Sequence, residues 1–178
     1  MTTVTVKDKR FRLSIPADEL QGAIRRVADA ITADYAGQQP LFLAVLNGSF
    51  MFAADLLRMV QLPCEIAFVK MSSYAGMDST GTVRELIGLN QDIEGRPVII
   101  VEDIVDTGRT MQHMLGLLRA RNPKSIDICT LLFKPEKLEE PLDIRYAALQ
   151  IPNDFIVGYG LDYDGFGRNL PQIYTITD

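Results

Sequence analysis

The residues best suited to chemistry stand together in one short stretch of the sequence. Three acids, Glu102, Asp103 and Asp106, fall within five residues at the end of an apolar run, Val98–Val101, that is typical of a buried strand. Such carboxylates can hold a divalent cation, bind ribose hydroxyls or accept a proton. In an open α/β sheet, ligands bind beyond the carboxyl ends of the strands, where these acids are expected to lie.

The next four residues add features that suit an anion. They read Thr107-Gly108-Arg109-Thr110 and open a predicted helix. Loop amides, the two threonine hydroxyls and the helix N-terminus together form a cradle for a negatively charged group. Gly108 lets the backbone approach a phosphate closely. The stretch therefore predicts a site for a phosphorylated ligand.

Ordinary surface structure is the alternative interpretation of these acids. For any single acid after a strand, a solvated turn residue is the commoner case, with Thr107 as a helix cap. Three carboxylates this close to the end of a hydrophobic strand are electrostatically costly unless cations or hydrogen-bond donors compensate them. The complete string favours a ligand site.

The composition limits the class of protein. The chain has 178 residues, of which 47% are hydrophobic and 23% charged, so it is expected to fold as one globular domain, residues 1–178. Disordered, collagen-like and disulfide-stabilised classes are excluded. With 18 Lys and Arg against 23 Asp and Glu, the net charge of −5 argues against binding nucleic acid or an anionic membrane through bulk electrostatics.

Cysteine and histidine usage excludes two further kinds of site. Cys64 and Cys129 are far apart in apolar runs and are expected to fill the core. His113 is the single histidine, which excludes a metal site built on imidazoles. The first residues lack the apolar segment of a signal peptide and no run reaches membrane-spanning length, so we expect a cytoplasmic protein.

Helix and strand patterns alternate along the chain. Apolar residues at helical spacing follow Pro16 and indicate a helix that ends near Gly37, and a second such pattern indicates a helix from Thr110 to Arg119. Ser49 is expected to cap another helix. Predicted strands cover residues 41–46, 64–71, 83–88, 97–101, 125–133 and 155–158. The alternation predicts an α/β fold with a mostly parallel sheet flanked by helices.

Two segments stand outside that alternation. Residues 72–82 are small and polar and include two glycines, which predicts a flexible loop long enough to act as a lid. The turn-rich stretch after Pro135 is expected to form a small appendage.

Residues 98–110 resemble the signature of the type I phosphoribosyltransferases, in which a hydrophobic strand precedes two acids and an Asp-Thr-Gly-x-Thr loop. Other stretches, in the same order and spacing, resemble the hypoxanthine-guanine branch of that family. They are Leu46-Asn47-Gly48-Ser49, Ser73-Tyr74, Leu131-Leu132-Phe133-Lys134 and Phe155-Ile156-Val157-Gly158-Tyr159-Gly160-Leu161-Asp162-Tyr163. The resemblance covers about residues 40–168 and implies the type I phosphoribosyltransferase fold with a small hood and a flexible lid loop.

The resemblance implies a purine salvage reaction. Hypoxanthine or guanine displaces pyrophosphate from phosphoribosyl pyrophosphate, which gives IMP or GMP. Positive charge develops on the ribose and negative charge on the leaving pyrophosphate, and a magnesium ion suits the second requirement. Mg²⁺ is the implied cofactor, and a homodimer or homotetramer is the implied assembly.

The resemblance also implies a role for each matching residue. Asp106 is the implied general base, which takes a proton from the purine. The implied phosphoribosyl and phosphate site comprises Glu102, Asp103, Asp106, Thr107, Gly108, Arg109 and Thr110. The implied pyrophosphate site comprises Asn47, Gly48 and Arg168, and the implied purine site comprises Lys134, Phe155, Ile156 and Asp162. The implied metal ligands are Glu102, Asp103 and Asp162, and the implied lid contacts are Ser73 and Tyr74.

One position departs from the family pattern. Asn47 stands where many members carry lysine or arginine beside the pyrophosphate, at a peptide bond that can be cis in the family. A cation for pyrophosphate is therefore missing, although the backbone amides of Asn47 and Gly48 remain. We expect a weaker direct contact with pyrophosphate at this point.

Two other functions are considered. A regulatory protein of the same fold that senses nucleotides and binds RNA would need a basic face, which a chain of net charge −5 does not suggest. A transferase specific for xanthine or a pyrimidine is the alternative within the enzyme class. Lys134, with Phe155 and Ile156, favours a 6-oxopurine, whereas the order of preference among such bases is not encoded in these residues.

Overall fold

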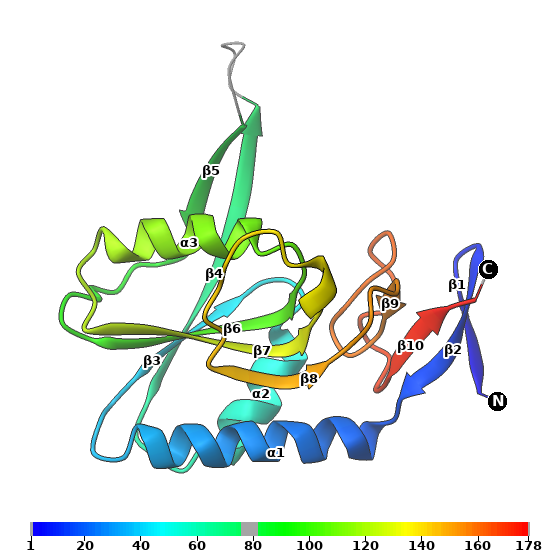
Figure 1. Cartoon of the computed structure of the whole chain (residues 1–178), viewed down its shortest axis with the longest axis horizontal. Helices are drawn as coiled ribbons and strands as arrows, with labels where there is room; N and C mark the ends of the chain where they lie inside the picture. Colours follow the sequence, from blue (N-terminus) through cyan, green and yellow to red (C-terminus); the bar gives the residue numbers. More distant parts are fainter. Residues whose placement is uncertain (1, 76–81, 178) are drawn as a thin grey trace.

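A six-stranded sheet with the strand order β5-β4-β3-β6-β7-β8 forms the larger part of the molecule (Figure 1). The computed structural model describes residues 2–75 and 82–177. The strands are β3 (Leu41–Val45), β4 (Glu65–Ala75), β5 (Thr82–Ile87), β6 (Pro97–Val105), β7 (Ser125–Phe133) and β8 (Tyr146–Gln150). Neighbouring strands are parallel except for β4 and β5, which confirms the mostly parallel sheet.

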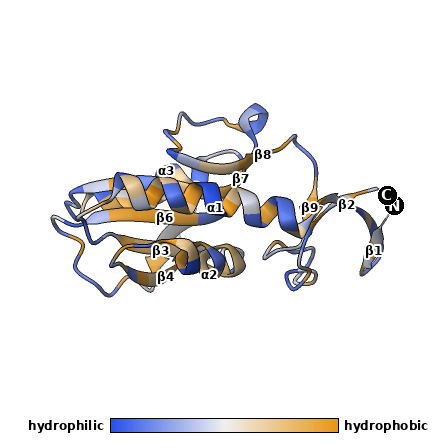
Figure 2. Cartoon of the chain, turned by 90° about the horizontal axis from the view of Figure 1, so that it is seen from below, coloured by the Kyte–Doolittle hydropathy of each residue, from blue (hydrophilic) through white to orange (hydrophobic). Residues whose placement is uncertain are grey.

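The α-helices of the described residues cover both faces of this sheet (Figure 1). They are α1 (Ala17–Asp34), α2 (Phe50–Met59) and α3 (Arg109–Arg119), and a short 3₁₀ turn, η1 (Pro135–Lys137), follows β7. Alternate residues of β3 point to opposite faces. Phe42 packs in the core beneath α1 and α2, whereas Leu43 packs in the core beneath α3. Hydrophobic residues are accordingly concentrated along β3, β4 and β6 in Figure 2.

A second, antiparallel sheet with the order β1-β2-β10-β9 brings the two ends of the chain together (Figure 1). We call this sheet the hood; its strands are β1 (Thr3–Val6), β2 (Lys9–Ile15), β9 (Ile156–Val157) and β10 (Ile173–Ile176). Phe11 is fully buried in its small core. Of these strands only β9 was expected from the sequence. β1 is a short strand of a local hairpin with β2, and β2 and β10 pair with each other across more than 150 residues of the chain.

The strands beside the predicted site are longer than the sequence indicated. β6 continues four residues past Val101, to Val105, because its ladder with β7 continues from Glu102 to Val105. Likewise β4 extends to Ala75 and pairs with β5 from Thr82, so the ends of the predicted loop 72–82 are strand. The tip of that loop and the predicted lid contacts of Ser73 and Tyr74 lie outside what the structure describes.

The stretch after Pro135, expected to form a small appendage, is divided between the two sheets: β8 joins the main sheet beside β7, whereas β9 and β10 belong to the hood. Cys129 is buried and Cys64 is half-buried against the same core, and both are free thiols. Ser49 is the N-cap residue of α2, although its side chain makes no capping hydrogen bond. Within residues 2–75 and 82–177, no helix is both long and apolar enough to cross a membrane.

Candidate active site

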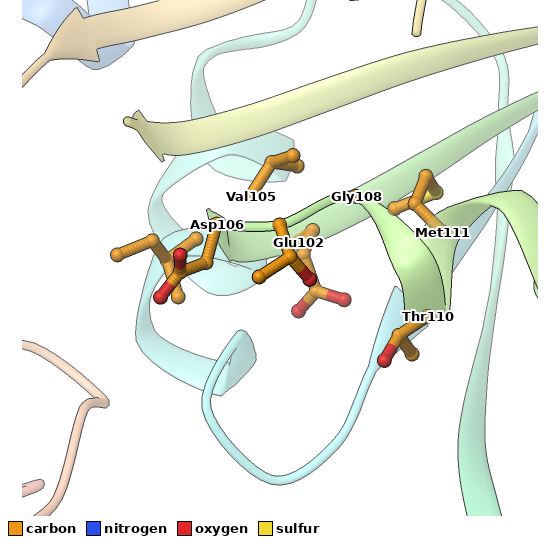
Figure 3. A pocket seen from close by; sticks show the side chains of 8 residues that line it. Glu102, Val105, Asp106, Gly108, Thr110 and Met111 are labelled. Carbon is orange, nitrogen blue, oxygen red and sulfur yellow. The ribbon is translucent and has the colours of Figure 1, made fainter. Parts of the chain in front are cut away.

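The acidic stretch lies at the carboxyl end of β6, beside a pocket of about 100 Å³. The pocket is lined by Glu102, Ile104, Val105, Asp106, Thr107, Gly108, Thr110 and Met111. The labelled side chains of Glu102, Asp106 and Thr110 turn their oxygen atoms toward the same open space (Figure 3). The structure therefore brings two of the three predicted acids, Glu102 and Asp106, to one cavity together with the predicted phosphate loop, residues 107–110, of which all but Arg109 line it.

The loop between β6 and α3 has the backbone of an anion cradle. Gly108, the residue before α3, has φ of +83°, a left-handed conformation that suits glycine. A Cβ there would lie 2.9 Å from the side chains of Leu138 and Leu142. The N-terminus of α3 opens on this loop, and a helix N-terminus favours negative charge. The guanidinium of Arg109 forms an ion pair with Glu139, so this side chain is directed to a neighbouring segment.

Asp106 lies between two lysines. Its Oδ2 accepts a hydrogen bond of 2.9 Å from Lys137 Nζ and lies 3.9 Å from Lys134 Nζ. Its Oδ1 is buried and has no hydrogen-bond partner among the described residues. A buried, unpaired carboxylate oxygen is costly unless a ligand supplies the missing donor. The unpaired oxygen therefore indicates that a ligand supplies a hydrogen-bond donor here.

Lys134 is buried although its side chain carries a charge. Only 6% of the residue is exposed, and its Nζ donates a hydrogen bond of 2.7 Å to the Asp154 carbonyl. Burial lowers the pKa of the ammonium, and nearby Asp106 opposes that effect. Two of the three ammonium donors remain for other partners. A cation held in this way can donate to a carbonyl oxygen of a ligand.

Phe155 and Ile156 follow Asp154 and have different surroundings. Phe155 is 47% exposed. Its ring packs edge-on against Tyr163 at 5.9 Å and at a tilt of 41° against Phe11 at 6.2 Å between ring centroids. Ile156 is buried in β9. An aromatic ring that is fixed on one side and open on the other offers a stacking surface for a flat ligand.

Glu102 and Asp103 form a carboxylate pair that fits a cation. Burial, and then the charge of Asp103, raise the pKa of Glu102 well above its usual range. Neither carboxylate has a lysine or arginine as an ion-pair partner within the part of the chain that the structure describes. Hard divalent cations such as Mg²⁺ take one or two carboxylates together with water and phosphate oxygens. The donor set suits that ion.

Asp162, the third predicted metal ligand, is not gathered with this pair. Its Oδ1 forms an ion pair with Arg168 at 2.8 Å, and its Oδ2 accepts a hydrogen bond from the Gly165 amide at 2.7 Å. Arg168 also donates to the Gly160 carbonyl. Across the described residues, no three His, Cys, Asp or Glu side chains cluster as a metal site. The structure thus joins Asp162 to Arg168, the predicted pyrophosphate residue.

The loop between β3 and α2 packs directly against the acidic stretch. Its Leu46–Asn47 peptide bond is cis, which is the state that the resemblance allows. A Cβ on Gly48 would overlap the Asp103 carboxylate, and a Cβ on Gly160 would overlap the Gly48 carbonyl. Three segments far apart in the sequence therefore meet at Gly48.

Replacing Gly48 by alanine is expected to displace Asp103 and to lower kcat/KM by about 100-fold, since a small misplacement of a binding group has an effect of this order. Steady-state kinetics of purified G48A measure the change. G116A is the matched control, because a Cβ at Gly116 in α3 meets no atom within 4 Å. Equal activity of the two variants would contradict the assigned contact.

Lys137 belongs to this site and was missed from the sequence. It lies at the end of η1, three residues after Lys134, and it reaches Asp106 from there. The pattern Lys134-Pro135-Glu136-Lys137 gave one signal, because a proline after a lysine favours a tight turn that returns the next lysine toward the strand end.

Comparison with known proteins decides the family. A phosphoribosyl transferase domain is matched over residues 16–164, which is most of the chain. The chain belongs to the phosphoribosyltransferase family. The match leaves out β1, β2 and β10, three of the four strands of the hood.

Individual relatives of this phosphoribosyltransferase carry more specific names. Hypoxanthine phosphoribosyltransferase of Buchnera aphidicola subsp. Schizaphis graminum is 44% identical and covers 92% of this chain and 94% of its own. Hypoxanthine-guanine phosphoribosyltransferase of Mycobacterium tuberculosis is 41% identical and covers 91% and 84%. The crystal structure of a hypoxanthine-guanine phosphoribosyltransferase from Bacillus anthracis superposes with a TM-score of 0.85 at 37% identity, covering 93% and 97%. The type I phosphoribosyltransferase fold is thereby confirmed.

Proposed function

We propose that this phosphoribosyltransferase transfers the 5-phosphoribosyl group of phosphoribosyl pyrophosphate to a 6-oxopurine, hypoxanthine or guanine, and releases pyrophosphate. The observation that carries the proposal is that Asp106, whose Oδ1 has no partner among the described residues, lies next to buried Lys134, with 3.9 Å between Lys134 Nζ and Asp106 Oδ2. Both stand beside a pocket that is built like a phosphate cradle. The names of the relatives, which are hypoxanthine and hypoxanthine-guanine enzymes, support the same base class.

The proton acceptor in this proposal is Asp106. As a ring nitrogen of the purine bonds to the anomeric carbon, its proton passes to Asp106 Oδ1. The bond from that carbon to pyrophosphate breaks, and its electron pair leaves with the pyrophosphate. General base catalysis of this kind contributes about 10²–10⁴ to the rate. Lys134 donates a hydrogen bond to the 6-oxygen of the base, and the exposed face of Phe155 stacks on its ring while the Ile156 backbone meets its edge.

The phosphoribosyl group is held by the loop that follows β6. Backbone amides of residues 107–110 and the hydroxyls of Thr107 and Thr110 bind the 5′-phosphate at the N-terminus of α3. Glu102 and Asp103 accept hydrogen bonds from the ribose hydroxyls. Arg109 contributes through its backbone, because its side chain pairs with Glu139.

Mg²⁺ is the proposed cofactor, and its protein contacts would come from Glu102 and Asp103. The ion neutralises charge on the pyrophosphate group when it is bound. Asp162 and Arg168 lie in one ion pair, so they are proposed to meet the pyrophosphate side of the site together. The small number of carboxylates is consistent with an ion that keeps water and substrate phosphates as its other ligands.

A base-by-base assay tests the proposed function. Purified protein, Mg²⁺ and phosphoribosyl pyrophosphate are mixed with hypoxanthine, guanine, xanthine, adenine or uracil, and nucleotide formation is followed. We expect turnover of hypoxanthine or guanine. Turnover of xanthine or uracil alone would agree with the proposed type of reaction but would overturn the role given to Lys134. No turnover with any base would favour the regulatory alternative.

Asn47 is expected to add little to pyrophosphate binding through its side chain. An amide carries no charge to offset pyrophosphate, so the backbone amides of Asn47 and Gly48 supply the contact. N47A should therefore bind pyrophosphate within about twofold of the unchanged protein, as measured by calorimetry. Tight binding that collapses in N47A would contradict this account.

Assembly as a homodimer or homotetramer is proposed from the family resemblance. The exposed apolar side chains of Ile66, Phe68 and Ile87 on β4 and β5 support it, because such a surface is the kind that association covers.

A further inference from the structure

The phosphate loop is braced by a segment that the proposed mechanism does not use. Residues 137–142, which we call the brace, connect η1 to the chain that leads into β8. The amides of Glu139 and Glu140 donate hydrogen bonds of 2.9 and 3.3 Å to the Thr107 carbonyl. Gln112 of α3 donates one of 2.5 Å to the Pro141 carbonyl. The phosphate loop and α3 are therefore held by hydrogen bonds to residues 139–141, which do not line the cavity.

Lys137 is the point where the brace reaches a reacting group. Its Nζ lies 2.9 Å from Asp106 Oδ2, whereas the Nζ of Lys134 lies 3.9 Å from that atom and is bonded to the Asp154 carbonyl. Lys137 is thus the closer of the two cations. Neither lysine forms a hydrogen bond with Asp106 Oδ1, which is buried without a partner in the described residues.

The contact selects one orientation of the carboxylate. The terminal torsion of an aspartate is broad and close to two-fold, so an unrestrained carboxylate exchanges its oxygens and swings between positions. A charge-assisted hydrogen bond to one oxygen limits that motion. The end of η1 fixes the starting point of the lysine side chain. One oxygen is then anchored, and the other, Oδ1, keeps a fixed position in which no described residue pairs with it.

We infer that Lys137 is a positioning residue for Asp106, which holds Oδ2 so that Oδ1 faces the donor group of the purine. This inference rests on the proposed role of Asp106 as proton acceptor. Lys137 does not itself touch the substrate in this arrangement. Its removal should therefore slow the chemical step while the binding of phosphoribosyl pyrophosphate is preserved.

The test compares K137M, K137R and K124M in steady-state kinetics. We expect K137M to lower kcat about tenfold with KM for phosphoribosyl pyrophosphate changed less than twofold, because a misoriented group impairs reaction more than binding. K137R should retain most of kcat, since it can still donate to Oδ2. K124M controls for the loss of an exposed lysine elsewhere and should be unchanged. Thermal unfolding of each variant checks that the fold is kept.

A double-mutant cycle with D106N shows whether Lys137 affects kcat through Asp106. If Lys137 acts through Asp106, then K137M adds no further loss of kcat to D106N. The inference would be overturned if the losses of kcat in K137M and D106N multiplied in the double variant. It would also be overturned if K137M raised only KM, or if its kcat equalled that of K124M. Full activity of D106N alone would instead overturn the proposed base, so failures of the two proposals are separable.

Discussion

D106N is expected to lose about 10²–10⁴ in kcat and to bind phosphoribosyl pyrophosphate almost as tightly as the unchanged protein. An amide has nearly the shape of the carboxylate but cannot take up the proton of the base. The hydrogen bond that Lys137 donates to Oδ2 can persist if the amide oxygen occupies that position. Rates come from single-turnover assays, and affinity for phosphoribosyl pyrophosphate comes from calorimetry.

The control for D106N is D143N, because Asp143 is an exposed acid that lies outside the pocket at β6. D143N should leave both kcat and the affinity for phosphoribosyl pyrophosphate unchanged. Equal turnover by D106N and D143N would remove Asp106 as the proton acceptor. A large loss of phosphoribosyl pyrophosphate affinity in D106N would instead assign Asp106 mainly to binding.

Removal of divalent cations is expected to abolish turnover completely. Glu102 and Asp103 bring two carboxylates to the site without a lysine or arginine partner among the described residues, and the leaving pyrophosphate adds more negative charge. Without a cation, burial and the charge of Asp103 raise the pKa of Glu102 and so favour its neutral form, and the charge on pyrophosphate stays uncompensated as substrate binds and product leaves. The measurement is nucleotide formation in excess chelator, followed by titration with MgCl₂.

When MgCl₂ is then added back, we expect the rate of nucleotide formation to recover. NaCl at matched ionic strength is the control, because it screens charge without coordinating carboxylates. Full activity in excess chelator would contradict the magnesium assignment, and recovery with NaCl would reduce the ion to a screening effect.

Local patterns predicted the elements that carry the acidic stretch. The continuous apolar runs of β3 and of Val98–Val101 in β6, and the helical spacing of Met111, Met114 and Leu118 in α3, were sufficient, because each of these stretches has a buried face and its pattern is visible within a short window. The acids after β6 were also found from their types and spacing alone, and the structure brings Glu102 and Asp106 to one pocket.

Long-range contacts account for what the sequence did not predict. β10 forms by pairing with β2 and β9, as in the register of Ile176 with Phe11, and no local pattern encodes the distant partner β2. The end of β6 was placed too early because polar residues 102 and 103 look like a turn, although the ladder with β7 keeps them in the strand. Lys137 acquires its role only from a contact with Asp106 across 31 residues.

The hood also has a consequence for the order in which the molecule is completed during synthesis. Phe155 rests on Phe11, which is made early, but β10 is the strand that joins β2 to β9 in the hood. Until Ile173–Ile176 leave the ribosome, β2 has only β1 as a partner, and an isolated hairpin is marginally stable in water. The phosphate loop can form from residues that are synthesised well before the end, whereas the stacking surface for the base is finished only by the last strand in chain order.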